Sequence, residues 1–401
     1  MKILVLNCGS SSVKYKLIEM PSANILAQGG LEKLGLKDSF LKHAKGDGAK
    51  EIIQKEIAEH TAGIEFILNI LTDPERGVVR SLTEIDAVGH RVVHGGEKFN
   101  SSVRITREVI EKIEECIPLA PLHNLPNLKG IQAIEKLMPN APQVAVFDTA
   151  FHQTMPQKAF MYALPYEFYE EKGVRRYGFH GTSHNYVSKR AFEALNIKPE
   201  SSRIITCHIG NGGSITAIKN GKSIDTSMGM TPLEGLVMGT RVGDIDAGTV
   251  IYLMQENKYS TQEMSSILNN KSGLLGISGE SSDMRDVQGK IEEGNKRAAL
   301  AVEMFQYRVK KYIGAYIAAL GGLDVLVFTG GIGENNYRIR ELICNDLECL
   351  GIQIDKEINA NTIGEERILS PEDSKVTVIV IPTDEEFMIA SDTLGIVGSQ
   401  S

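Results

Sequence analysis

The sequence predicts an α/β protein made of two duplicated domains, because one strand-and-turn pattern occurs twice. A short apolar strand runs into a glycine–serine turn at residues 3–12 (ILVLNCGSSS), and the pattern recurs at residues 204–213 (IITCHIGNGG). Turns of this kind present backbone N–H groups and small side chains at the tip of a strand, where phosphate is the usual ligand. Two of them in one chain suggest two related halves with a nucleotide in the cleft between them.

Two further elements recur in the same order in both halves. A strand ends on two glycines in residues 86–96 and 323–335, and a strand ends on an acidic residue in residues 143–149 and 376–386. The offsets are 200, 237 and 233 residues, measured from Leu4 to Ile204, from Val88 to Val325 and from Val144 to Thr377. Three elements in one order indicate a duplicated domain with insertions. The alternative is chance similarity, since every α/β protein has strands that end in glycine.

The length and the local patterns outline the domains. A chain of 401 residues is too long for one ordinary core. We expect a first domain over residues 1–150, a second over 151–385, and a helical tail, 386–401, that returns to the first domain. Helical spacing of apolar residues occurs in three segments: 51–71, 107–117 and 183–195, the last with an N-cap at Thr182-Ser183. Residues 203–226 predict a hairpin that turns at Asn220-Gly221-Lys222.

Composition excludes several classes of protein. Hydrophobic and charged contents of 42% and 23% are typical of soluble globular proteins, and a net charge of −8 argues against nucleic-acid binding. Five cysteines without a C-x-x-C pair fit reduced thiols in a cytosol. The apolar run after Lys2 is too short for a signal peptide, and the stretch 312–328 is interrupted at Gly321-Gly322 and Asp324. That stretch predicts a buried helix followed by a buried strand, and we expect a cytoplasmic protein with no membrane partner.

None of the common nucleotide-binding motifs is present. Gly221-Lys222-Ser223 matches the end of a Walker A motif, but Thr216 stands where its first glycine should be, and no G-x-G-x-x-G occurs. Nucleotide binding would rest on the turn sequences GSSS, GNGG and GGIGEN. Each is weak evidence alone, and their placement at equivalent strand ends of two halves strengthens it.

Basic side chains lie beside these turns, and each has a structural alternative. Arg91 can present its planar fork to a carboxylate or phosphate, or form a structural ion pair. Arg241 lies in a glycine-rich loop, where anion binding is slightly favoured. His180 precedes a helix N-terminus, which attracts anions, and His208 is equally consistent with a hydrogen-bonded core residue.

Acidic side chains end two equivalent strands. Asp148 and Glu385 lie where α/β sheets bind ligands, although a strand-end acid is commonly a cap. Asn7 and Glu385 carry oxygen donors suited to a Mg²⁺ ion that keeps most of its waters.

Together these motifs resemble the acetokinase family, of the acetate and sugar kinase/Hsp70/actin superfamily. The resemblance covers essentially the full chain and is carried by residues 4–17, 89–99, 118–128, 144–156, 175–184, 208–215, 225–248, 328–336 and 382–386. It implies two duplicated RNase H-like (actin-like ATPase) domains with the active site in the cleft between them. The implied reaction is reversible phosphoryl transfer from ATP to acetate, which gives acetyl phosphate and ADP, and the implied assembly is a homodimer.

The resemblance also implies roles for individual residues. Asn7 and Glu385 match the Mg²⁺ positions, where Mn²⁺ can substitute, and Arg91 matches the carboxylate-binding arginine. His180 and Arg241 match residues that stabilise the transition state, and Asp148 matches the catalytic acid. The ATP contacts are Lys14, His208, Ile209, Gly210, Asn211, Gly212, Asp283, Met284, Arg285, Gly331, Ile332, Gly333, Glu334 and Asn335. One departure is Asp384, where many relatives have Asn, which adds a negative charge beside the metal.

Chemical reasoning narrows the mechanism. Acetate is ionised at neutral pH, so its oxygen needs no base to attack, and the main obstacle is repulsion from the γ-phosphate. Asp148 is then better suited to orienting an arginine or a metal-bound water than to moving a proton, and direct in-line transfer needs no phosphoenzyme. Two alternatives stay open: a kinase of propionate or another short-chain acid, and a non-catalytic ATPase clamp of the actin type. The acid pocket would have apolar walls formed by Val93, Leu122, Phe179 and Pro232.

Overall fold

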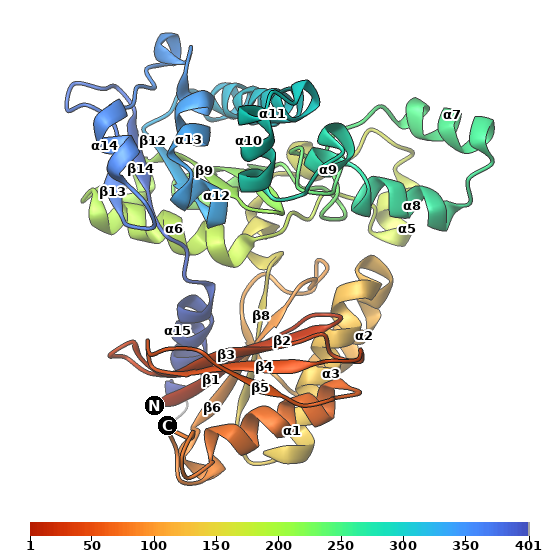
Figure 1. Ribbon diagram of the computed structural model, residues 1–401, viewed down its shortest axis with the longest axis vertical. Coiled ribbons are helices and arrows are strands. Elements are labelled where there is room, and N and C mark those ends of the chain that lie inside the picture. Colours follow the sequence, from red (N-terminus) through yellow and green to blue (C-terminus); the bar gives the residue numbers. More distant parts are fainter. Residues whose placement is uncertain (400–401) are drawn as a thin grey trace. The chain divides into compact units, whose positions relative to one another are not determined.

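A computed structural model describes residues 1–399 and divides them into two compact units (Figure 1). Unit 1 comprises Met1–Phe151 together with the chain from Asp384 onward, and unit 2 comprises His152–Thr383. Glu385 therefore belongs to unit 1, whereas the sequence-based division had placed it at the end of the second domain. The reason is that Glu385 is the first residue of helix α15 (Glu385–Gly398), which packs on strands of unit 1.

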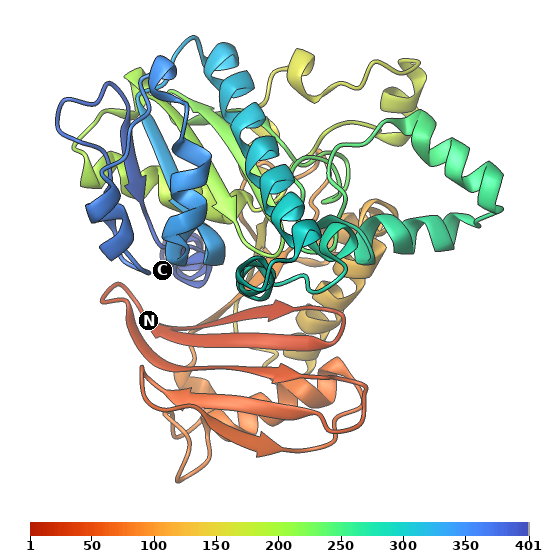
Figure 2. The same cartoon turned by 45° about the horizontal axis from the view of Figure 1, so that its top comes forward.

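Unit 1 is built on an eight-stranded sheet with the order β5-β4-β3-β2-β1-β6-β8-β7. Its first strands form an antiparallel meander, in which they lie side by side (Figure 2), and β1, β6 and β8 are parallel. The strands are β1 (Lys2–Cys8), β2 (Ser12–Glu19), β3 (Asn24–Glu32), β4 (Phe40–Lys45), β5 (Glu51–Gln54), β6 (Ala87–Val92), β7 (Val103–Arg104) and β8 (Gln143–Phe147). The helices are α1 (His60–Leu71), α2 (Arg107–Glu115), α3 (Pro121–Leu137) and α15.

Strand β1 is buried on both faces of this sheet. Its alternate residues Leu4 and Leu6 pack in a cluster with residues of α1 and α3, whereas Ile3 and Val5 pack with Ile389 of α15. A strand covered on both faces reads as a continuous apolar run, which is how the sequence ILVL appears. The helix at the C-terminus therefore completes the core of the unit that the N-terminus begins.

Unit 2 is built on a six-stranded sheet with the order β11-β10-β9-β12-β14-β13. Long helix α11 covers it and buries an apolar stripe that includes Phe305, Val309 and Ile313, as expected for the buried helix before strand β12. The strands are β9 (Arg203–Ile209), β10 (Gly213–Lys219), β11 (Lys222–Thr226), β12 (Val325–Thr329), β13 (Arg367–Ile368) and β14 (Thr377–Val380). The helices are α4 (Gln157–Phe160), α5 (Glu167–Lys172), α6 (Gly181–Ala194), α7 (Ala247–Asn257), α8 (Thr261–Asn270), α9 (Gly273–Ser278), α10 (Met284–Glu292), α11 (Lys296–Leu320), α12 (Gly330–Asn335), α13 (Tyr337–Cys344) and α14 (Lys356–Asn361).

Strand register confirms the predicted duplication. Leu4 of β1 pairs with Val88 of β6, and in unit 2 Ile204 of β9 pairs with Val325 of β12. These are the residues that the offsets of 200 and 237 had equated. The third offset was wrong by one residue, since Val88 pairs with Gln143 and Val325 pairs with Thr377, which makes it 234.

Three local predictions need correction. Residues 51–71 are an edge strand followed by a helix that begins at His60, because a short amphipathic strand cannot be distinguished from a helical turn by spacing alone. Thr182 and Ser183 lie inside α6, whose N-cap is His180 at φ 56°. The predicted turn at Asn220-Gly221 is present, with both residues at positive φ, but it joins the last two strands of a three-stranded meander.

A buried arginine stabilises helix α12, which is formed by the GGIGEN sequence. The Arg340 side chain is fully buried, and its guanidinium donates to the carbonyl oxygens of Gly333, Glu334, Asn359 and Thr362 and to Asn359 Oδ1, at 2.7–3.0 Å. Burial lowers its pKa to about 10. Arg340 thus ties α12 to α14 through backbone acceptors.

Replacing Arg340 by methionine should lower the free energy of unfolding by about 3 kcal/mol or more, because several buried acceptors lose their donors at once. Chemical denaturation of both proteins measures the difference. Arg340→Lys serves as the control, since its ammonium keeps the charge and reaches fewer of the acceptors. A methionine variant as stable as the parent would contradict the structural role.

Candidate functional site

In unit 1 the arginine and the acid singled out in the sequence form one ion pair. Arg91 lies on β6 and Asp148 directly follows β8, the adjacent parallel strand. Arg91 Nε donates to both carboxylate oxygens at 3.0 and 3.1 Å, and Nη2 donates to Oδ2 at 2.6 Å. The Asp148 side chain is 2% exposed and that of Arg91 is 21% exposed. Asp148 therefore fixes one edge of the guanidinium and leaves the Nη1 edge for another anion.

A second carboxylate, Glu385, lies beside this pair. Its Oε2 is 4.0 Å from Arg91 Nε. Burial, against the opposing charge of Arg91, raises the pKa of Glu385 to about 7; the charges of Asp148 and Glu386 contribute to the rise, and Lys14 also opposes it. A buried carboxyl with this pKa, next to other carboxylates, is a group that a cation would stabilise in its charged form.

The donor set fits a hydrated divalent cation. Asn7 near the end of β1 pairs in register with Lys14 of β2, and both belong to unit 1 together with Glu385. Within residues 1–399 no three His, Cys, Asp or Glu side chains converge as a metal site. A cation held by Asn7 and Glu385 would therefore keep most of its waters, as Mg²⁺ does. Their joint ligation of a metal stays a prediction.

The unusual Asp384 is already engaged. Its carboxylate is the N-cap of α15, where it accepts from Phe387 N at 2.9 Å, and it forms an ion pair with Lys16 at 3.3 Å. Lys16 also pairs with Glu386 at 3.5 Å. The additional negative charge is thus partly balanced by a lysine on β2.

Glu385→Gln should remove a pH dependence of stability in the metal-free protein. Between the ordinary pKa of 4.5 and the value of about 7, the folded protein holds a proton that the unfolded chain has lost. The contribution of Glu385 to stability is therefore present below pH 4.5 and is lost as pH rises through 7. Thermal unfolding at pH 5 and pH 8 should favour the variant increasingly at high pH, by on the order of 2 kcal/mol. Parallel pH curves for both proteins would contradict this, and Glu111→Gln on the exposed face of α2 is the control.

In unit 2 a chain of hydrogen bonds lies behind His180. His180 Nδ1 is 2.9 Å from Ser214 Oγ, which is also 2.7 Å from His184 Nε2. His184 Nδ1 in turn is 2.7 Å from Thr206 Oγ1, and burial holds the pKa of His184 well below its ordinary value. His208 stacks on His180, with ring centroids 4.3 Å apart. These contacts orient the ring of His180 from behind.

Within residues 1–399, Arg241 is a cation without an acidic partner. It donates through Nη1 to the carbonyl oxygen of Pro232 at 3.0 Å, and no ion pair forms there among the described residues. Burial lowers its pKa. A Cβ placed on Gly212 would lie 3.5 Å from Arg241 Nη1 and 3.8 Å from His180 Cε1, so these two side chains converge on the GNGG turn. Such a site is suited to an anion.

A cavity of about 610 Å³ adjoins that turn in unit 2. It is lined by Gly210, Asn211, Ser282, Asp283, Met284, Arg285, Gly331, Ile332, Asn335 and Asn336. Eight of these had been assigned to ATP from the sequence, whereas Ser282 and Asn336 were missed, although each adjoins an assigned segment. The volume lies in the range of small-molecule sites.

Several predicted nucleotide contacts do not line this cavity. Glu334 Oε1 instead accepts from Gly330 N at 2.7 Å and Thr383 N at 3.0 Å, which stabilises the start of α12. His208 Nδ1 is engaged with Ser183 Oγ at 2.8 Å. Ile209, Gly212 and Gly333 are likewise absent from the lining, and Lys14 belongs to unit 1.

The four predicted walls of the acid pocket are divided between the units. Val93 is buried and its N–H donates to Asn127 Oδ1, whereas Leu122 in the first turn of α3 is 76% exposed. Both lie in unit 1, and Phe179 and Pro232 lie in unit 2. Whether the four share one pocket stays a prediction.

The two duplicated α/β units, together with the Arg91–Asp148 ion pair and the side chains of His180 and Arg241, define a kinase of the actin-like ATPase class. The chain belongs to the acetokinase family, whose model matches residues 2–391. It is 61% identical over 396 residues to the acetate kinase of Bacteroides thetaiotaomicron, which covers 99% of each chain. The crystal structure of Porphyromonas gingivalis acetate kinase is 60% identical with a TM-score of 0.96 and covers 99% of each chain. A propionate kinase from Francisella tularensis is 44% identical with a TM-score of 0.92, over 98% of this chain and 99% of that one.

A helix that spans a bilayer needs about 20 predominantly apolar residues. Over residues 1–399, no helix combines the length and apolar character of a membrane-spanning segment.

Proposed function

We propose that this protein catalyses reversible phosphoryl transfer from ATP to acetate, which gives acetyl phosphate and ADP. The observation that supports this most directly is identity of about 60% to acetate kinases over 99% of the chain. The geometry agrees with it, because Arg241, a partly buried cation with no acidic partner among residues 1–399, and His180 converge on a glycine turn beside a cavity of about 610 Å³. Positive groups of this kind stabilise the charge on a transferring phosphoryl group.

Each set of site residues would have its own role in binding or phosphoryl transfer. The cavity in unit 2 would hold the adenosine side of ATP, and Arg241 and His180 would donate to oxygens of the transferring phosphoryl group. Arg91 would bind the carboxylate of acetate through its Nη1 edge, while Asp148 keeps its other edge fixed. Acetate attacks as an anion, so no side chain needs to remove a proton.

Mg²⁺, with Mn²⁺ as a substitute, would be held by Asn7 and Glu385. The fit rests on the raised pKa of Glu385, which follows mainly from burial with smaller contributions from Asp148 and Glu386, so that a bound cation would favour its charged form. When bound, the ion would neutralise phosphate charge during transfer. We also propose that the protein is a cytoplasmic homodimer, as the family resemblance implies.

A hydroxamate assay with ATP, Mg²⁺ and a series of formate, acetate, propionate and butyrate tests the function. We expect acyl phosphate to form fastest with acetate. ATP hydrolysis without acyl phosphate would instead favour the clamp. A preference for propionate would favour the alternative that the 44% identity to a propionate kinase keeps open, because one methylene changes specificity by only about 1–3 kcal/mol.

A further inference from the structure

The chain between β11 and α7 is a long segment without helices or strands that carries two of the proposed site residues. It begins after Thr226, ends before Ala247, and contains both Pro232 and Arg241. A catalytic group on such a segment needs support from neighbouring side chains, because a displacement of about 1 Å can cost 10²-fold in rate. This segment, which we call the 227–246 loop, is held by contacts with neighbouring side chains.

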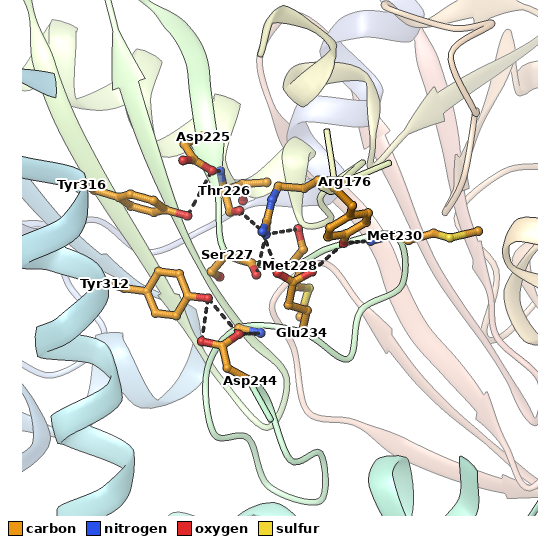
Figure 3. Close-up of polar contacts among 12 residues, drawn as sticks. Arg176, Asp225, Thr226, Ser227, Met228, Met230, Glu234, Asp244, Tyr312 and Tyr316 are labelled. Carbon is orange, nitrogen blue, oxygen red and sulfur yellow. Dashed lines mark hydrogen bonds and ion pairs between the residues drawn. The ribbon is translucent and has the colours of Figure 1, made fainter. Parts of the chain in front are cut away.

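The side chain of Arg176 binds backbone carbonyl oxygens at the start of the loop (Figure 3). Its Nη1 donates to the carbonyl oxygens of Thr226, Ser227 and Met228 at 2.9, 3.1 and 3.3 Å. Its Nη2 donates to Glu234 Oε1, further along the loop, at 2.6 Å. One guanidinium thus joins the end of β11 to a residue beyond Pro232.

Glu234 is held from the other side by a tyrosine. Tyr162 Oη donates to Glu234 Oε2 at 2.6 Å and accepts from Met230 N at 3.0 Å. The tyrosine also packs closely on the loop, since a Cβ on Gly229 would lie 2.3 Å from Tyr162 Oη. Both carboxylate oxygens of Glu234 are therefore hydrogen-bonded, and these bonds fix the turn from Gly229 to Glu234.

Arg176 also lies on the segment that leads to His180. The next two residues, Tyr177 and Gly178, donate their N–H groups to the carbonyl oxygen of Gly229 at 3.1 and 3.2 Å. Arg176 and the loop are thus joined by side chain and backbone together, four residues before His180. Arg241 lies on the same loop, and its Nη1 donates to the carbonyl oxygen of Pro232 within it.

A separate contact closes the neck of the loop. Asp244 Oδ1 accepts from Gly235 N at 2.9 Å, and both its oxygens accept from Tyr312 Oη (Figure 3). Arg308 Nη1 lies 3.2 Å from Asp244 Oδ2 and donates to the carbonyl oxygen of Gly235 at 2.9 Å. This clamp fixes the loop against α11 and does not involve the segment before His180. The two sets of contacts are therefore separable by mutation.

We infer that Arg176 and Glu234 form a positioning pair that holds the 227–246 loop against the segment before His180, and thereby sets Arg241 and His180 in register for phosphoryl transfer. Neither residue of the pair lines the cavity proposed for ATP, and the effect of the pair passes through the backbone of the loop. The inference rests on the proposed function. It adds residues remote from the cavity lining to those that determine the rate.

Charge around the pair favours a fixed arrangement. Arg176 is 17% exposed and Glu234 is 32% exposed, and Asp225 of β11 adds a further carboxylate near the guanidinium. Burial alone would lower the pKa of Arg176, but Glu234, the neighbouring tyrosines and Asp225 raise it above its ordinary value. Removing the cation would leave acidic groups facing one another, so the loop would shift rather than remain in place.

The test compares Arg176→Met, Arg176→Lys, Glu234→Gln and the double variant Arg176→Met with Glu234→Gln. The matched control is Arg190→Met, which removes an arginine–glutamate pair of unit 2 that has no contact with the loop. The measurements are kcat for acyl phosphate formation per folded site, KM for ATP and acetate, and the thermal midpoint. Hydrogen exchange at the amides of Met230 and Gly239 reports on the loop directly.

Arg176→Met should lower kcat about 100-fold with KM for ATP changed less than about threefold, and Arg176→Lys should recover part of the loss. The double variant should be no slower than Arg176→Met, because the two residues act as one unit. Arg190→Met should keep its kcat.

An unchanged kcat per folded site with only a lower midpoint would overturn the inference, as would losses in the double variant that multiply. If Arg176→Met does not fold, Glu234→Gln and Arg176→Lys decide by the same criteria. If the wild type forms no acyl phosphate, the proposed function fails. In that case faster exchange at Met230 and Gly239 in Glu234→Gln, and not in Arg190→Met, supports the positioning pair, and unchanged exchange overturns it.

Discussion

Arg241→Ala should lower kcat for acyl phosphate formation by about 10³-fold, the largest effect expected of any single substitution in unit 2. The guanidinium is partly buried and has no carboxylate partner among residues 1–399, so its charge is available to the transition state. Because ground-state ATP is proposed to bind mainly through the neighbouring cavity, KM for ATP should change little. Steady-state kinetics with ATP and acetate varied separately measure both quantities.

Arg285→Ala provides the contrast for this experiment. Arg285 lines the cavity, but its side chain is 84% exposed and already pairs with Asp283 at 2.6 Å. Its loss should raise KM for ATP modestly and leave kcat nearly unchanged. If Arg241→Ala instead raised KM for ATP and left kcat intact, Arg241 would be a ground-state contact and its proposed role would be wrong.

The duplicated architecture could be predicted because equivalent strands of the two halves end in similar residues. Two offsets matched paired residues of both sheets, since strands buried on both faces keep their apolar runs and their terminal glycines. The third offset failed by one residue, because an apolar run has no internal mark of register. The start of α6 was also missed, because its N-cap is a histidine at positive φ rather than a serine or threonine.

The cavity lining in unit 2 could be predicted from short motifs, whereas contacts between residues far apart in the sequence could not. Eight residues of the cavity lining lie in glycine-rich or family-like segments that the sequence displays. The contact of Arg176 with Glu234 spans 58 positions, and most of its acceptors are backbone carbonyls, which carry no side-chain signature. Likewise, the sequence left open whether Arg91 pairs with an acid or binds a ligand, and the geometry allows both at once, on different edges of the guanidinium.

Arg91→Ala is expected to lower kcat/KM for acetate by about 10³-fold, more than it affects ATP use. Part of that loss follows from the charge it leaves behind. Asp148 is 2% exposed and would lose its ion pair while Glu385 remains nearby. Breaking one partner of a buried pair costs about 3–5 kcal/mol, so folding must be checked by circular dichroism and thermal unfolding. An unchanged KM for acetate with a raised KM for ATP would contradict the assignment.

A double-mutant cycle separates the role of Asp148 from that of Arg91. If Asp148 acts only by orienting Arg91, Asp148→Asn should lower the rate on its own, and should lower it no further, or even restore part of it, in the Arg91→Ala background. A proton-transferring Asp148 would instead give losses that multiply. It would also impose an acidic limb on the pH profile of kcat/KM, since the base must be unprotonated, and that limb would vanish in Asp148→Asn. Ionisation of acetate falls in the same pH region, so the profile requires a fluorinated acetate of lower pKa. With that substrate we expect the limb to be absent from the wild type and the whole profile of Asp148→Asn to be lowered evenly. A limb that is present in the wild type and disappears only in the variant would make Asp148 the proton-transfer residue.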